Sequence, residues 1–145
     1  MPRTLPPAAH PDEVEQRFYE ALQRGDLAAM MSCWTDEDDA VCVHPGGARL
    51  VGLAAVREAF AAMFTQGGVP IRAEVVHRLQ QPGVAVHSVV ETVRVATDDG
   101  GLEAVVWATN VYAQTPQGWR MVLHHASPAP AAAQPAEPVI SKTLH

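Results

Sequence analysis

The sequence predicts an α+β domain in which three N-terminal helices pack on a strongly curved, mostly antiparallel sheet. Three observations support this fold class. Apolar residues recur at helical spacing in the first half of the chain, whereas β-branched residues alternate with polar ones after Pro70. Turn signals divide the second half into long extended segments. Helices that precede a meander of strands are typical of α+β folds, and strands of this length can curl around a cavity.

Three segments in the first half have the periodicity of helices. The first begins at Asp12, which pairs with Glu15 as a predicted capping box, and it ends at Gly25. A shorter helix is predicted over residues 26–34, before an acidic and turn-rich break. The third, over residues 56–64, carries an apolar stripe and stops at a pair of glycines.

Two short strands and four long ones complete the predicted fold. The short strands lie at residues 40–44 and 49–51, before the third helix. Glycine-containing turns separate the long strands, which span residues 70–80, 84–97, 102–115 and 118–127. Because hairpins join the long strands, neighbours in the sequence are expected to pair in an antiparallel manner, with the helices covering one face of the sheet.

Proline is concentrated at the two ends of the 145-residue chain, where eight of its twelve prolines lie. Such segments bury too little apolar surface to offset the entropy lost on ordering. We therefore expect one domain over residues 12–127, a disordered N-terminal tail over residues 1–11, and a Pro/Ala-rich C-terminal tail over residues 128–145.

The composition argues against several classes of protein. The formal net charge is −6 without a basic cluster, so neither nucleic acid nor a membrane surface is an expected partner. Cys33 and Cys42 lack the spacing of a disulfide framework or a zinc site, and no glycine-rich phosphate loop is present, so we expect no metal and no cofactor. Without a signal peptide or an apolar run of about 20 residues, a soluble cytoplasmic protein is expected.

His44 is the most informative single residue, because an apolar strand runs into it and is stopped at once by Pro45 and two glycines. The ordinary pKa of histidine is about 6.5, so burial or one charged neighbour decides whether it works as a base, an acid or a neutral partner. The alternative is a structural histidine that bonds the backbone of the turn.

The order of elements and several motifs resemble the NTF2-like superfamily. In the first half these motifs are Gln16-Arg17-Phe18, Gly25-Asp26-Leu27 and Val43-His44-Pro45-Gly46. The closing runs look like those of small SnoaL-like proteins and of calcium/calmodulin-kinase association domains; they are Trp107 to Tyr112, Gly118-Trp119-Arg120 and His124 to Pro128. The resemblance covers about residues 12–128, and its SnoaL-like and ketosteroid-isomerase-like members are the most similar.

This resemblance implies an α+β cone with a ligand-binding pocket between the helices and the concave sheet, and a homodimer. In the ketosteroid-isomerase-like pattern, His44 stands at the position of the catalytic base and Asn110 at that of an oxyanion donor. Phe18 stands where the pattern has a tyrosine. Tyr19, the next residue, lies about 100° around the helix and is not expected to replace it.

Further residues are candidates for the wall of this pocket. Aromatic side chains in helices and strands are equally consistent with an ordinary core. His124 and His125 point to opposite faces of the last strand, and simple alternation places His125 on the apolar face unless a bulge reverses it. A metal held by His44 and one of them lacks a third ligand, so none is expected. The ligand-binding candidates are Phe18, Trp34, Phe60, Tyr112 and His125.

Two functions fit these observations. The first is a cofactor-independent isomerase, dehydratase or cyclase that acts on a small apolar carbonyl compound, in which His44 moves a proton and Asn110 stabilises the oxyanion. The second is a ligand-binding or association domain without chemistry. The fold by itself does not choose between them, because one architecture hosts many functions.

Overall fold

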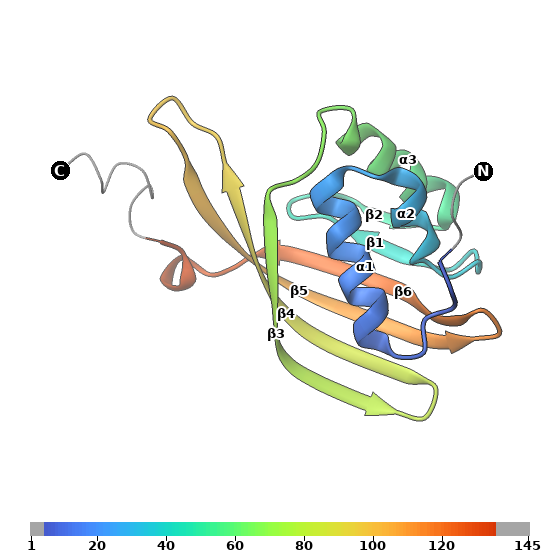
Figure 1. The fold of residues 1–145 in the computed structure, drawn as a ribbon. Coiled ribbons are helices and arrows are strands. Elements are labelled where there is room, and N and C mark those ends of the chain that lie inside the picture. Colours follow the sequence, from blue (N-terminus) through green and yellow to red (C-terminus); the bar gives the residue numbers. More distant parts are fainter. Residues whose placement is uncertain (1–4, 136–145) are drawn as a thin grey trace.

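The structure, a computed structural model, describes residues 5–135 and has two layers, with helices on one face of a six-stranded sheet (Figure 1). The elements follow the predicted order and confirm the predicted fold class. They are α1 (Pro11–Arg24), α2 (Leu27–Ser32), β1 (Val41–Val43), β2 (Arg49–Val51), α3 (Leu53–Phe64), β3 (Ile71–Gln81), β4 (Val84–Val95), β5 (Leu102–Thr115), β6 (Gly118–Pro128) and a 3-10 turn at Ala131–Ala133.

The strand order is β2-β1-β6-β5-β4-β3, so the four long strands form the expected antiparallel meander. The short strand β1 pairs in parallel with the free edge of β6, and β2 pairs antiparallel with β1 in turn. The far end of the β4–β5 hairpin projects beyond the helical layer (Figure 1). Among residues 5–135, no helix is long and apolar enough to cross a bilayer.

The start of α1 differs from the sequence prediction, whereas its end agrees with it. The helix begins at Pro11 with His10 as its N-cap, so the predicted capping box of Asp12 and Glu15 is wrong. Proline suits the first helical position because its missing N–H has no partner there in any case. At the other end Gly25 caps the helix with a φ of 67°, a left-handed conformation that favours glycine.

The chain on either side of the predicted domain packs against it. We predict a tail over residues 1–11, yet Ala8 is buried and its carbonyl accepts a hydrogen bond of 3.0 Å from the Trp119 N–H. Beyond β6, the Gln134 side-chain amide donates to the Val105 carbonyl (2.7 Å) and accepts from the Val105 N–H (2.8 Å). This amide continues the β-pairing of β5 where β6 has ended. Residues 1–4 and 136–145 of the predicted tails lie outside the described residues.

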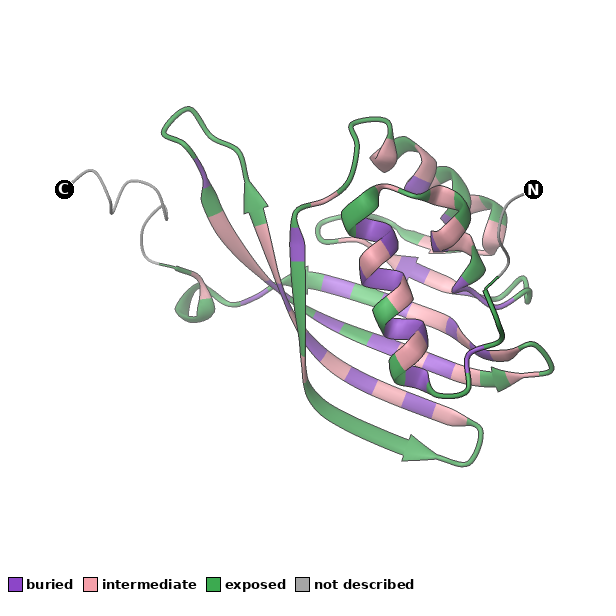
Figure 2. Ribbon diagram, viewed as in Figure 1, coloured by how far each residue is buried: buried purple, intermediate pink, exposed green. Residues whose placement is uncertain are grey.

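The core lies between the helices and the sheet face that they cover, which we call the inner face (Figure 2). Burial alternates along β4 and β5, as period-two geometry requires, so every second side chain points under the helices. Phe18, Trp34 and Phe60 are at most 1% exposed and fill the centre of this layer. No helix in the described part of the chain covers the opposite, outer face (Figure 1).

Candidate functional site

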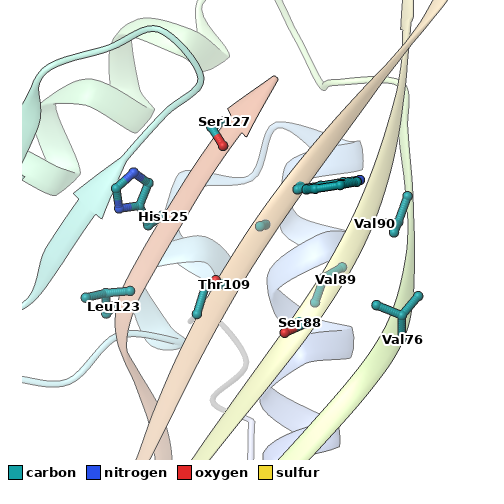
Figure 3. A pocket seen from close by; sticks show the side chains of 10 residues that line it. Val76, Ser88, Val89, Val90, Thr109, Leu123, His125 and Ser127 are labelled. Carbon is teal, nitrogen blue, oxygen red and sulfur yellow. The ribbon is translucent and has the colours of Figure 1, made fainter. Parts of the chain in front are cut away.

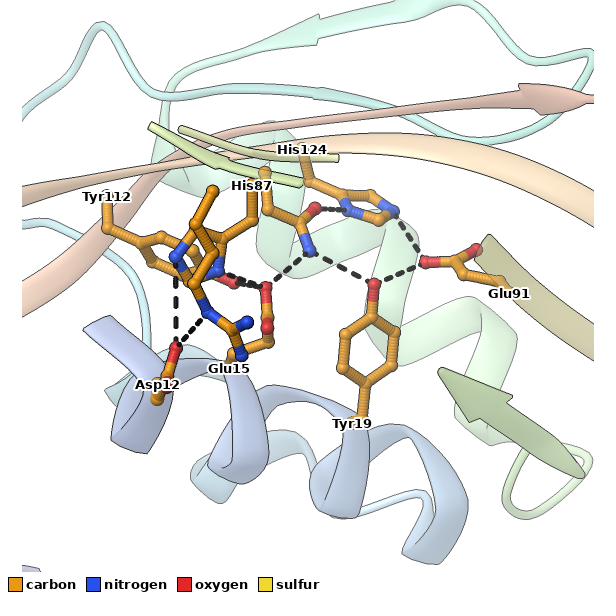
Figure 4. A network of polar contacts seen from close by, with 9 residues as sticks. Asp12, Glu15, Tyr19, His87, Glu91, Tyr112 and His124 are labelled. Atoms are coloured by element: carbon orange, nitrogen blue, oxygen red, sulfur yellow. Dashed lines mark hydrogen bonds and ion pairs between the residues drawn. The ribbon is translucent and has the colours of Figure 1, made fainter. Parts of the chain in front are cut away.

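Seven polar side chains are buried between α1 and the inner face of the sheet, and none is more than 6% exposed (Figure 4). Burying such groups is costly unless each finds a partner. We call them the polar cluster: Glu15 and Tyr19 on α1, His87 and Glu91 on β4, Asn110 and Tyr112 on β5, and His124 on β6.

Secondary structure brings these residues to one layer. Glu15 and Tyr19 are four apart on a helix and so share a face, while strand residues an even number apart point to the same side. Strand register then places residues of different strands side by side. Asn110 pairs with His87 on one side and with His124 on the other. Asn110 therefore lies at the middle of the cluster.

One half of the polar cluster is centred on the Glu15 carboxylate. Its Oε2 atom accepts a hydrogen bond from the Tyr112 hydroxyl at 2.6 Å and lies 2.9 Å from His87 Nδ1. The Asn110 amide donates to the same oxygen at 3.4 Å. This half reaches the surface at Asp12, whose carboxylate lies 3.8 Å from His87 Nε2.

Glu91 and His124 form the second half. The Tyr19 hydroxyl donates to Glu91 Oε2 at 2.6 Å and accepts from the Asn110 amide at 3.0 Å. His124 Nδ1 lies 2.6 Å from the Asn110 amide oxygen, and its Nε2 lies 4.0 Å from Glu91. Because an amide oxygen only accepts, Nδ1 of His124 carries the proton and Nε2 is the basic nitrogen.

Burial changes the charge of this half. Removal from water raises the pKa of Glu91 to about 7, and the negative charge of Glu15 adds to the rise. Burial also lowers the pKa of His124 to about 3, with smaller contributions from His44 and His125. At neutral pH His124 is therefore neutral, and Glu91 titrates close to the working pH.

His44 stands directly after β1 and is half-buried. Its ring meets Phe60 edge to face with centroids 5.0 Å apart, and the His124 ring lies 6.3 Å away. Burial lowers the pKa of His44. His124 contacts both predicted catalytic residues, by ring proximity to His44 and by a hydrogen bond to Asn110.

Three of the predicted wall residues, Phe18 on α1, Trp34 just after α2 and Phe60 on α3, pack as core. The rings of Phe18, Trp34 and Phe60 lie within 6.5 Å of one another, centroid to centroid. Tyr112, predicted to share a face with Asn110, does so and is fully buried. Next to His44 the space between the helices and the sheet is thus occupied by aromatic rings.

His125 lies on the outer face, away from the helices. A register shift between β5 and β6, next to Val111 and Tyr112, reverses the simple alternation and turns His124 inward. His125 instead lines a pocket of about 730 Å³ on the outer face (Figure 3). Its other side-chain lining includes Val76, Ser88, Trp107, Thr109 and Leu123.

One group in the described part of the chain has the composition of a metal site. Ligand atoms of Asp12, Glu15 and His87 lie within 4.8 Å of one another. However, the two ring nitrogens of His87 face different carboxylates, and the Asp12 carboxylate is paired with the Arg78 guanidinium at 3.1 Å. These groups satisfy one another without a metal ion.

Comparison with known proteins gives the family. The SnoaL-like domain matches residues 12–132, so the chain belongs to this family within the NTF2-like superfamily. No curated protein matches the chain.

Solved structures show the same fold. A candidate calcium/calmodulin-dependent protein kinase type II association domain from Thiobacillus denitrificans is 35% identical, with 87% of this chain and 100% of that chain covered and a TM-score of 0.78. A candidate dehydratase of the NTF2-like family from Streptomyces avermitilis is 29% identical (83% and 94% covered, TM-score 0.73). A ketosteroid isomerase-like protein from Erwinia carotovora atroseptica is 18% identical (82% and 94% covered, TM-score 0.70).

Proposed function

We propose that this SnoaL-like protein is a cofactor-independent enzyme that moves a proton on a small apolar carbonyl compound, with His44 as the base. The observation that carries the proposal is a half-buried imidazole that meets the Phe60 ring edge to face and lies 6.3 Å, centroid to centroid, from a second, neutral imidazole, that of His124. The likeness to a candidate dehydratase supports the same class of chemistry.

The environment of His44 suits a base. Its lowered pKa keeps the ring neutral at pH 7, so one ring nitrogen carries a lone pair; Nε2 lies 3.6 Å from the Cys42 sulfur. When His44 takes a proton from the carbon next to a carbonyl, the enolate and an imidazolium form together. Return of the proton to another carbon completes an isomerisation. In a dehydration, the β-hydroxyl group takes this proton from the imidazolium and leaves as water, which restores neutral His44; neither reaction consumes a cofactor.

The polar cluster supplies the electrostatic support. Glu91 lies 4.0 Å beyond His124, so its carboxylate form stabilises positive charge that develops on the imidazole side. Asn110 stands at the oxyanion position of the isomerase pattern, but its amide donates to Glu15 and Tyr19. We therefore assign Asn110 to positioning His124 rather than to contact with the substrate.

The test uses 3-cyclohexen-1-one, whose conversion to the conjugated enone is followed by ultraviolet absorbance. Deuterium incorporation from D2O into this ketone and into a β-hydroxy ketone is measured by NMR. A general base contributes about 100-fold or more, so His44→Gln should reduce exchange by at least about 100-fold. Arg49→Gln, an exposed change just beyond the same turn, should leave it unchanged. Full activity in His44→Gln would refute the role of His44, and no exchange in the wild type would refute the enzyme.

The outer face favours a second function, association with another copy of this chain. Trp107 and Val76 are 48% and 57% exposed on this face and border its pocket. We propose that two sheets pack face to face in a homodimer, as the likeness to a candidate association domain supports.

Sedimentation velocity tests this homodimer, and it should show a dimer that Trp107→Lys dissociates. Val95→Lys changes an apolar residue that is 43% exposed on the projecting hairpin, and it should leave the dimer intact.

A further inference from the structure

We propose that the indole N–H of Trp34 donates a hydrogen bond to the carbonyl oxygen of an uncharged, ring-sized ligand, and that this ligand takes the place of the Phe60 ring. The proposal deepens the proposed function, on which it rests for the kind of ligand. It adds a donor for the carbonyl oxygen opposite the base.

The starting observation is an unpartnered donor. Within residues 5–135, Trp34 Nε1 is the one buried side-chain nitrogen or oxygen atom that has no hydrogen-bond partner. Trp34 is 1% exposed, so water does not reach this N–H from the surface. An unmade hydrogen bond of this kind is costly, and native interiors rarely tolerate it without a reason. In the same layer every member of the polar cluster has a hydrogen-bond partner. The unpaired indole N–H of Trp34 is therefore an exception that calls for an explanation.

The indole is held in place by its backbone. Trp34 forms an isolated parallel bridge with Met121, and its carbonyl accepts a hydrogen bond of 2.9 Å from the Arg120 guanidinium. The neighbouring Thr35 N–H donates to the Met121 carbonyl at 2.9 Å. The donor is therefore preorganised on the edge of the sheet and does not depend on a mobile loop.

Phe60 is the ring that neighbours both the Trp34 indole and the proposed base. Its ring centroid is 6.4 Å from that of Trp34 and 5.0 Å from that of His44. Displacement of this one ring leaves a space the size of a six-membered ring with the indole on one side and the imidazole on the other. A cyclic ketone in that space can accept from Trp34 while its α-carbon faces His44.

Phe60 belongs to a helix with few buried side chains. Only Val56 and Phe60 of α3 are buried, whereas seven residues of α1 are. Elements with few buried apolar side chains open at lower free-energy cost than the rest of a domain. Movement of α3, with Phe60 as its main anchor, thus provides entry for the ligand without disturbing α1 and the polar cluster.

Charge defines the class of ligand. The rings around Phe60 are Phe18, Trp34, Phe64 and His44, and burial keeps His44 neutral. No ring partner offers a permanent positive charge to an anion. The space therefore fits a neutral ketone better than a carboxylate of the same size.

The test follows the indole N–H signals by NMR while cyclohexanone is added. The chain has three tryptophans, and Trp34→Phe identifies the Trp34 signal by its loss. We expect cyclohexanone to move this signal downfield in a saturable manner, whereas methylenecyclohexane, with a carbon in place of the oxygen, should not. Trp34→Phe should weaken ketone binding about fivefold and leave hydrocarbon binding unchanged.

A second variant keeps the test decisive if Trp34→Phe fails to fold. Phe60→Leu removes part of the ring, and it should tighten binding of both probes while the downfield shift stays specific to the ketone. An indole signal that cyclohexanone does not move in either the wild type or Phe60→Leu overturns the proposal. So does a signal that both probes move equally, or one with a cross-peak to a bound water that the ketone does not displace.

The outcomes separate this inference from the proposed enzyme. A ketone-specific shift at Trp34 without any deuterium exchange supports the donor and refutes the enzyme. Exchange that needs His44, is unchanged in Trp34→Phe and occurs without an indole shift supports the enzyme and refutes the donor.

Discussion

The two faces of the sheet are opposites in where they place polar and apolar groups. On β5, Asn110 points inward and is fully buried, while Trp107, three residues earlier, points outward and is 48% exposed. Polar side chains are usually exposed and large apolar ones buried. Each face thus departs from the usual distribution in its own direction. The inner face thus holds buried polar groups that bond one another, whereas the outer face presents large apolar side chains to solvent.

The largest expected effect comes from the centre of the polar cluster. Asn110→Ala removes hydrogen bonds to His124, Tyr19 and Glu15 and leaves buried groups without partners. We expect the free energy of unfolding to fall by about 3 kcal/mol, measured by urea denaturation. The matched control Gln114→Ala removes an exposed amide from the same strand and should cost less than about 0.5 kcal/mol. Equal costs would show that the cluster is not a stabilising network.

The second prediction concerns the pH dependence of Glu91. Its pKa of about 7 in the folded state lies above its ordinary value of 4.5, so the folded protein holds the proton more tightly. The resulting stabilisation is complete below pH 4.5 and is lost as the pH rises through 7. Relative to Glu91→Gln, which cannot ionise, the wild type should lose about 3 kcal/mol of unfolding free energy between pH 4.5 and 8.

The control for this prediction is a carboxyl group whose contribution to stability changes with pH in the opposite direction. Arg72 holds the pKa of the partly exposed Glu103 below its ordinary range, so Glu103 stabilises the fold at higher pH and loses its contribution as the pH falls. The difference between the wild type and Glu103→Gln should therefore grow with pH. A flat difference for Glu91→Gln across the same range would contradict the buried, protonated state of Glu91.

Tyr19→Phe should lower the free energy of unfolding by a smaller amount, and it tests the role of the Tyr19 hydroxyl. The hydroxyl donates to Glu91 and accepts from Asn110, so its loss should cost about 1.5 kcal/mol. The hydrogen bond from Tyr19 lowers the pKa of Glu91, so Tyr19→Phe should raise that pKa further. The carboxyl carbon shift of Glu91 in NMR reports this change, and a fall in the pKa would count against the assigned geometry.

The smallest effect is expected where the cluster meets water. Arg78 and Asp12 form an ion pair of 3.1 Å, but their side chains are 53% and 61% exposed. Exposed pairs of this kind contribute less than about 1 kcal/mol and are screened by salt. Arg78→Gln should therefore cost less than about 0.5 kcal/mol at low salt and nothing measurable at high salt. A cost comparable to that of Asn110→Ala would remove the distinction between the buried and exposed ends.

Local signals predicted the strands well and the site only in part. The long strands lie within about two residues of their predicted ends, because glycine-containing turns interrupt them. The predicted position of His44 at a strand end is confirmed by β1, which ends at Val43. Much of the polar cluster escapes prediction: the pattern assigns Glu15 to a capping box, and Tyr19 is not expected to replace the donor missing at Phe18. A helix that sits in a concave sheet buries a wide face, so two adjacent residues, Phe18 and Tyr19, both point inward.

The sequence by itself determined the α+β class, the order of elements, the place of His44 at a strand end and the shared face of Asn110 and Tyr112. These features depend on periodicity and turns, which act over a few residues. Only the tertiary structure decided that His124 rather than His125 faces inward, that Tyr19 reaches Glu91, and that Trp34 keeps an unpartnered N–H. Strand register, a bulge and the depth of helix packing control these features, and each joins residues that are far apart in the chain.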